Sequence, residues 1–172
     1  MLNFTKGIRH TILIVTTCFI SPTLLAASYL KTEKPFIMIK DEYRKAEAWG
    51  TCVAAYDIMS MIQGEAAPAT AKQFSDRSNG AKMALYMDYF MGMDSDSGSS
   101  QISARNKMAK LLSDSIPETQ LTAMMAEGEQ TKYGEEWLEK IVTTLELCIN
   151  NLDEQQRLID LWREMYASGA FE

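Results

Sequence analysis

Residues 41–64, DEYRKAEAWGTCVAAYDIMSMIQG, decide the fold of this 172-residue chain. Side chains recur here every three or four residues, which is the spacing of one helix face: Trp49, Cys52, Val53, Tyr56, Met59 and Ser60. A second apolar stripe lies beside the first and consists of Ala48, Ala55 and Ile62. Asp41 suits an N-cap, and Gly64 suits a helix end. We therefore expect a largely buried helix over residues 41–64.

The rest of the chain predicts further helices and no strands. Helical spacing places them at residues 68–91, 101–113, 115–127, 135–150 and 153–167. Ser115 and Glu118 have the spacing of a capping box, with Pro117 just inside it. No useful stretch alternates with the period of two that marks a strand. The sequence thus predicts an all-α single domain over residues 41–172, an irregular bundle of five or six helices in which 101–113 and 115–127 form a cap.

The helix at residues 135–150 has the most regular apolar pattern. It holds a helical stripe made of Trp137, Leu138, Ile141, Val142, Leu145, Cys148, Ile149 and Leu152. Asn150 and Asn151 suit a helix end, after which Asp153 suits the N-cap of the last helix. An unbroken helix over 135–167 is the alternative, because the apolar residues on both sides of the asparagines stay nearly in phase.

The first 27 residues have the pattern of a secretion signal peptide. Lys6 and Arg9 precede the apolar run TILIVTTCFI at residues 11–20, and small residues at 25–27 suit cleavage after Ala27. This pattern predicts a periplasmic or secreted protein. The apolar run is shorter than the roughly 20 residues that span a bilayer, so we expect no stable membrane anchoring after cleavage. Residues 28–40 then form an entry segment, whose apolar patch at 36–39 should pack against the bundle.

Cleavage would change the chemical inventory of the chain. His10 is the only histidine, so the cleaved chain has no His-based nucleophile system and no His-ligated metal site. The whole chain has 17 basic and 23 acidic residues and a charge of −6; loss of Lys6 and Arg9 leaves 15 against 23, a charge of −8. An acidic protein repels nucleic acid, so we expect no nucleic-acid partner.

Two cysteines remain after cleavage, Cys52 and Cys148. An even pair in an oxidising compartment favours a disulfide over two separate buried thiols. Closing a loop of about 100 residues stabilises a fold by on the order of 4–5 kcal/mol in the chain-entropy model. This disulfide would place the helix at 41–64 beside the helix at 135–150.

The stretch from Met83 to Met93 (MALYMDYFMGM) is the most unusual in composition. Interfaces favour Tyr, Phe and Met, so we predict a partner-binding surface made of Tyr86, Met87, Tyr89, Phe90 and Met91. Met83, Met87 and Met91 recur every four residues, and their soft sulfurs suit Cu(I). The same residues also suit plain core packing. The two readings of this stretch differ in exposure: an interface requires at least two of the five predicted residues to be exposed in one patch.

Carboxylates provide the only other candidate chemistry. Asp88 lies inside the apolar stretch, and we expect it to mark a solvated strip of its helix. Glu135, Glu136 and Glu139 cluster at a helix start, where the helix dipole favours acids. We therefore expect an exported, non-enzymatic interaction protein with an unknown protein partner and no cofactor. The alternatives are a protein that binds Cu(I) or a hydrophobic small molecule, and an enzyme that works through carboxylates alone.

Overall fold

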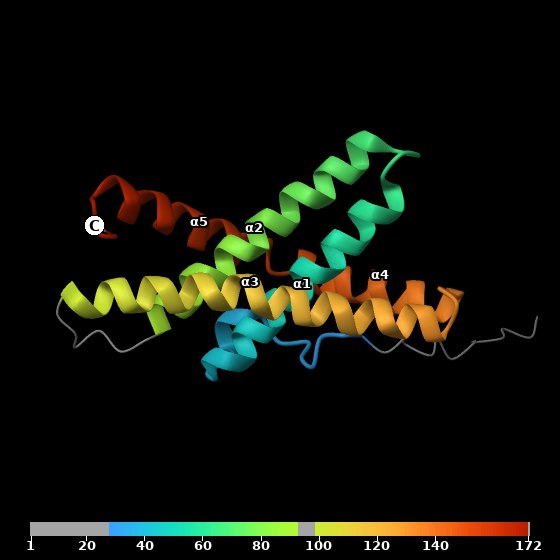
Figure 1. Ribbon diagram of the computed structural model, residues 1–172, viewed down its shortest axis with the longest axis horizontal. Helices are drawn as coiled ribbons and strands as arrows, with labels where there is room; N and C mark the ends of the chain where they lie inside the picture. The colour runs from blue at the N-terminus through green and yellow to red at the C-terminus, as the bar shows by residue number, and fades with distance from the viewer. Residues whose placement is uncertain (1–27, 93–98, 172) are drawn as a thin grey trace, which may run out of the picture.

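A computed structural model describes residues 28–92 and 99–171, which form one all-helical domain (Figure 1). The described elements are η1 (Phe36–Met38), α1 (Glu42–Gln63), α2 (Pro68–Gly92), α3 (Ser99–Gln130), α4 (Glu135–Ile149) and α5 (Leu152–Ala167). The predicted fold class is therefore confirmed, and the described residues include no strand. The predicted signal peptide at residues 1–27 lies outside the described residues.

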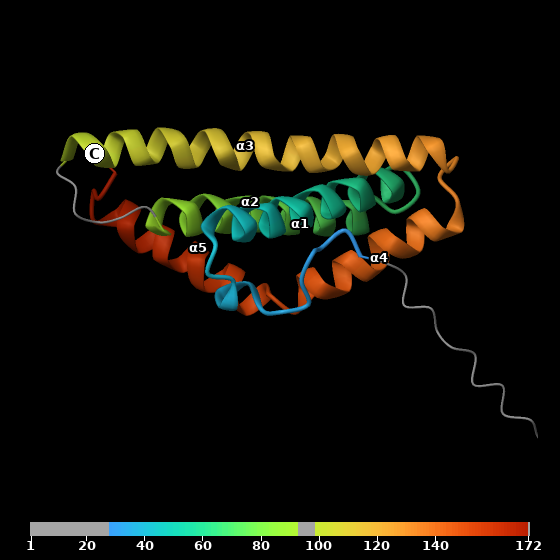
Figure 2. The same cartoon turned by 90° about the horizontal axis from the view of Figure 1, so that it is seen from below.

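The helices stack in three layers around a central pair. Figure 2 shows α1 and α2 in the middle, α3 on one side, and α4 and α5 on the other. α1 contacts α2, α3 and α4, while α5 packs on α2. The central helix α1 is buried along most of its length, from Ala46 to Ile58. The wide apolar surface of residues 41–64 thus reflects contact with three other helices, and the Asp41 side chain caps the start of α1 by accepting from Arg44 N.

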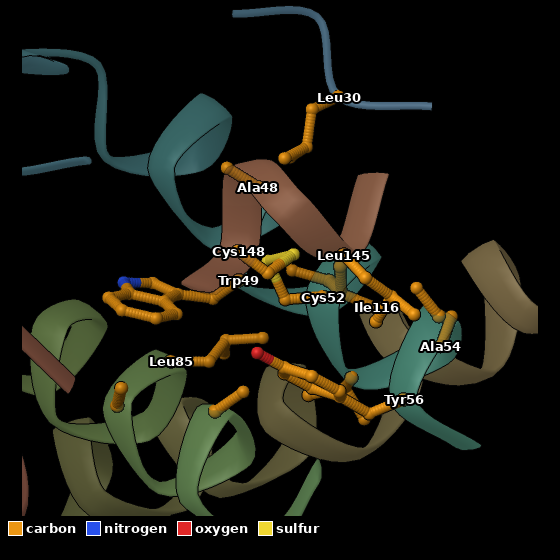
Figure 3. Packing of buried hydrophobic residues seen from close by; sticks show 14 of the residues in the cluster. Leu30, Ala48, Trp49, Cys52, Ala54, Tyr56, Leu85, Ile116, Leu145 and Cys148 are labelled. Carbon is orange, nitrogen blue, oxygen red and sulfur yellow. A yellow bond between two sulfur atoms is a disulfide. The ribbon is translucent and has the colours of Figure 1, made fainter. Parts of the chain in front are cut away.

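The predicted disulfide is present between Cys52 of α1 and Cys148 of α4, whose Cα atoms are 5.7 Å apart. Figure 3 shows it inside the apolar core, near Trp49 and Leu145. It fixes α4 against the middle of α1, as predicted. Because Cys148 faces α1, the disulfide also determines which side of α4 is turned toward the core.

The two short helices predicted at 101–113 and 115–127 are instead one helix, α3, which runs through Pro117. The buried residues Ala109, Ser113, Ile116 and Met124 form one continuous helical stripe on both sides of the proline. At the crossing with α1, a Cβ on Gly50 would lie 2.5 Å from Cγ2 of Ile116 and 3.4 Å from the Pro117 nitrogen. This close packing opposes the break that a proline and a capping-box pattern favour, so that prediction was wrong.

The predicted break between the last two helices is confirmed at Asn150 and Asn151. Asn151 is buried, and its side chain accepts from Phe36 N at 2.8 Å and donates to the Leu147 carbonyl at 2.9 Å. These bonds tie the entry segment to the corner between α4 and α5. Asp153 is in the first turn of α5 rather than at its N-cap, because Asn151 holds that position.

The entry segment packs against the bundle through one aromatic residue. Phe36 is buried and meets Trp49 edge-to-face, with ring centroids 4.8 Å apart. Ile39 is half-buried, whereas Ile37 and Met38 are exposed. The predicted packing of residues 36–39 is therefore correct at the ends of the patch and wrong in its middle.

Candidate functional site

The predicted partner surface on α2 is mostly core. Met87 is fully buried and Phe90 is 4% exposed, while Tyr86 and Tyr89 are half-buried. Tyr86 stacks on Phe90 and donates a hydrogen bond to Oδ1 of Asn106 in α3 at 2.8 Å. Met91 alone of the five is exposed, so they do not form the exposed patch that this prediction required.

The three methionines proposed for Cu(I) are in different environments. Met83 is half-buried, Met87 lies in the core and Met91 faces solvent. One ion would have to contact all three sulfurs at a single position. Side chains that lie in the core, at its edge and in solvent do not offer such a position. Within the described part of the chain, no group of three or more His, Cys, Asp or Glu side chains is arranged to hold a metal ion.

Asp88 is half-buried at the contact between α1 and α2, and our expectation that it marks a solvated strip was wrong. Its carboxylate accepts from Trp49 Nε1 at 3.0 Å and from Lys45 Nζ at 3.3 Å. Burial raises its pKa, and the nearby Lys45 ammonium partly opposes that rise. Lys45 also contacts Glu42. The two carboxylates thus share one ammonium group, an arrangement that holds the two helices together.

An apolar hollow lies between α1, α3 and α4, and we call it the groove. Its volume is about 320 Å³ and its lining has seven residues, none of them charged: Ile58, Met61, Ile62, Met125, Tyr133, Trp137 and Leu138. Four of them are exposed, namely Met61 (56%), Ile62 (46%), Tyr133 (48%) and Leu138 (40%). An exposed cluster of large apolar side chains marks an interaction surface more often than scattered ones do.

A tight turn between α3 and α4 builds one wall of the groove. Tyr133 N donates to the Gly128 carbonyl at 2.6 Å, and Lys132 N donates to the Glu129 carbonyl at 3.2 Å, as in a Schellman motif. Lys132 and Tyr133 have φ values of 55° and 53°, a left-handed conformation that non-glycine residues rarely adopt. Such strain concentrates at functional sites.

Close packing beneath the turn holds the Tyr133 ring in place. A Cβ on Gly128 would lie 2.7 Å from this ring and 2.9 Å from the Trp137 indole, so only glycine leaves room for both. The two rings meet edge-to-face at 5.2 Å, and Trp137 Nε1 donates to the Met124 carbonyl at 2.9 Å. The glycine in the sequence thus marks a close approach within α3, and the helix continues past it to Gln130.

The segment that supplies three groove residues is acidic. Residues 127–140 contain five glutamates and two lysines, a net charge of −3. Lys140 pairs with Glu127 at 2.9 Å. The other four glutamates are exposed: Glu129, Glu135, Glu136 and Glu139. The groove is therefore lined by side chains without charge, and the segment that forms one of its walls carries a net negative charge.

The groove was not predicted from the sequence, because the whole apolar stripe of α4 was expected to lie in the core. Trp137, Ile141, Leu145 and Cys148 are buried, whereas Leu138, Val142 and Ile149 are exposed. A 15-residue helix that packs mainly on α1 buries one stripe and leaves its neighbour in solvent. The signal was present in the sequence: the apolar surface of residues 137–152 is wider than one contact face.

No helix among the described residues has both the length and the apolar character needed to cross a bilayer. Comparison of the chain with protein-family models, with curated proteins and with solved structures gave no match.

Proposed function

We propose that this chain is an exported, non-enzymatic interaction protein that holds a basic amphipathic helix of a partner protein in the groove. The observation that carries the proposal is the exposure of Met61, Ile62, Tyr133 and Leu138 around one hollow that no charged side chain lines. Amphipathic helices bind such grooves through apolar side chains at positions i, i+3 or i+4, and i+7.

The exposed stripe of α4 supports a helical partner. Leu138, Val142 and Ile149 extend the apolar surface from the groove along 12 residues of α4, whose ends are about 16 Å apart at the rise of an α-helix. That length matches three turns of a second helix laid alongside. The stripe therefore enlarges the surface that a partner could cover beyond the groove itself, toward the roughly 800 Å² per partner of a standard-size interface.

The charge around the groove supports a basic partner. The exposed glutamates at 129, 135, 136 and 139 attract lysine and arginine on the polar face of an incoming helix. A second copy of this chain is a poor occupant, because the whole chain carries a charge of −6 and two acidic segments would face each other.

Export is supported by the sequence and by the cysteine pair. Residues 1–27 have the three regions of a signal peptide. The Cys52–Cys148 disulfide is the kind of cross-link that persists in an oxidising compartment. An exported interaction protein of this size benefits from a covalent link that survives outside the cytoplasm.

A synthetic peptide tests the groove. The probe is a labelled amphipathic peptide of leucine and lysine, about 14 residues or four helical turns long, and its binding is followed by fluorescence anisotropy. Leu138→Ser should weaken binding at least about tenfold, or about 1.4 kcal/mol. Leu111→Ser is the matched control, because Leu111 is 59% exposed on α3 and does not line the groove.

The specificity of this assay comes from two further comparisons. A peptide of the same composition with a scrambled, non-amphipathic order should bind at least about tenfold more weakly. Glu135→Gln with Glu139→Gln should weaken binding and reduce its dependence on salt. Equal losses in the Leu138 and Leu111 variants, or equal binding of both peptides, would refute the proposed site.

A further inference from the structure

The entry segment, residues 28–40, is held to the body at two points. Near its start, Tyr29 N donates to Thr144 Oγ1 at 3.0 Å, and Ser28 Oγ lies 3.1 Å from the same oxygen. Near its end, Phe36 N donates to Asn151 Oδ1 at 2.8 Å. Figure 2 shows the segment passing over the side of the bundle that carries α4 and α5. The chain between the two attachments contains no helix or strand, and η1 begins at the second attachment, Phe36.

A cavity of about 590 Å³ lies between this segment and the first half of α1, with Gln120 of α3 at its border. We call it the entry pocket. Part of its lining is apolar: Leu30, Met38 and Ile39 come from the entry segment, and Ala48 comes from α1. Figure 3 shows the Leu30 side chain pointing from the segment toward Ala48. A cavity of this size is in the range of small-molecule sites, about 300–1,000 Å³.

The charged side chains of the entry pocket have the opposite sign to the protein as a whole. Lys31, Lys34 and Arg44 line it together with one acid, Glu47, in a chain whose net charge is −6. Lys31 pairs with Glu47 at 3.5 Å. Among the described residues, no ion pair involves Lys34 or Arg44. Two cationic side chains are therefore left to face a ligand.

We propose that the entry pocket binds an amphiphilic anion: a carboxylate head held by Lys34 and Arg44, and an aliphatic body against Leu30, Met38 and Ala48. Arg44 offers a planar fork of donors that matches a carboxylate, and Lys34 adds a mobile ammonium group. The apolar residues occupy the same cavity, so one molecule of medium chain length satisfies both parts. This site shares no lining residue with the groove and is independent of the proposed protein partner.

Decanoate is a suitable probe, and isothermal titration calorimetry of the purified chain measures its binding. Decyltrimethylammonium has the same tail with the opposite charge and should bind at least about tenfold more weakly. The double variant Lys34→Gln/Arg44→Gln should weaken decanoate binding at least about tenfold. Its matched control is Lys72→Gln/Arg163→Gln, which removes the same two charge types from exposed positions outside the pocket.

The apolar part of the site has its own matched pair. Met38→Ser should weaken decanoate binding, whereas Met108→Ser should not, because both methionines are exposed and only Met38 lines the pocket. Leu138→Ser in the groove should leave decanoate binding unchanged, which separates the two proposals. Absence of saturable binding, equal binding of the anionic and cationic probes, or equal losses in the two charge-removal variants would overturn the inference.

Discussion

Substitution of Gly50 by alanine tests the crossing of α1 and α3, which holds the bundle together. A glycine inside an exposed helix destabilises it by roughly 0.5–1 kcal/mol relative to alanine. Helix propensity alone would therefore predict that Gly50→Ala stabilises the protein. In this structure the new Cβ would lie 2.5 Å from Cγ2 of Ile116, well inside van der Waals contact. Overpacking of a buried contact costs typically about 1–3 kcal/mol. We therefore expect a net loss of about 1–2 kcal/mol in the free energy of unfolding.

Urea denaturation followed by circular dichroism measures this loss, with the slope of the transition unchanged. A second substitution identifies the atom responsible. Ile116→Leu removes the Cγ2 branch, so the double variant should lose less stability than the sum of the two single variants, by about 1 kcal/mol. A stabilised Gly50→Ala protein, or simple additivity in the double variant, would show that α1 and α3 do not approach so closely.

Three further predictions concern the disulfide, the half-buried Asp88 and the buried Asn151. Replacement of Cys52 and Cys148 by serine should lower the free energy of unfolding by up to about 4–5 kcal/mol, as measured by urea denaturation, and a reductant should then have no further effect on the variant. Burial raises the pKa of Asp88 above its ordinary value of 3.8, so the folded protein holds this proton more tightly than the unfolded chain. The free energy of unfolding of wild type should therefore rise relative to that of Asp88→Asn as the pH falls from neutrality toward 3.8. A difference between the two proteins that does not change with pH would contradict the raised pKa. Asn151→Ala leaves the buried Phe36 N–H without its acceptor, which should cost about 1–3 kcal/mol and speed hydrogen exchange in residues 28–40, with an unchanged exchange rate as the contrary result.

The apolar pattern of the sequence predicted where the helices lie better than it predicted which of their side chains are buried. The cap at Asp41, the break at Asn150 and Asn151, and the cysteine pair depend on local chemistry or on two residues, and all three were readable from the sequence. The continuation of α3 through Pro117 was not, because it depends on Gly50 of another helix. Local signals favour a stop at that proline, and tertiary packing overrides them.

The candidate site could not be predicted from the sequence for a similar reason. Met and aromatic residues on α2 and apolar residues on α4 look alike in sequence, and both suit either a core or an interface. Their exposure depends on how many neighbours each helix has. α2 lies between other helices and buries Met87 and Phe90, whereas α4 lies at the edge and leaves Leu138 and Val142 in solvent. The number of neighbours is a property of the assembled fold, which no single segment contains.

Methyl NMR of the methionines tests the central claim most directly, because it reports where the leucine–lysine peptide binds. Met61 and Met125 line the groove, whereas Met91 and Met108 are exposed elsewhere on the described surface. We predict saturable shifts of the Met61 and Met125 methyl signals on titration with the peptide, with the Met91 and Met108 signals unmoved. Shifts at Met91 or Met108 while Met61 and Met125 stay in place would contradict the account.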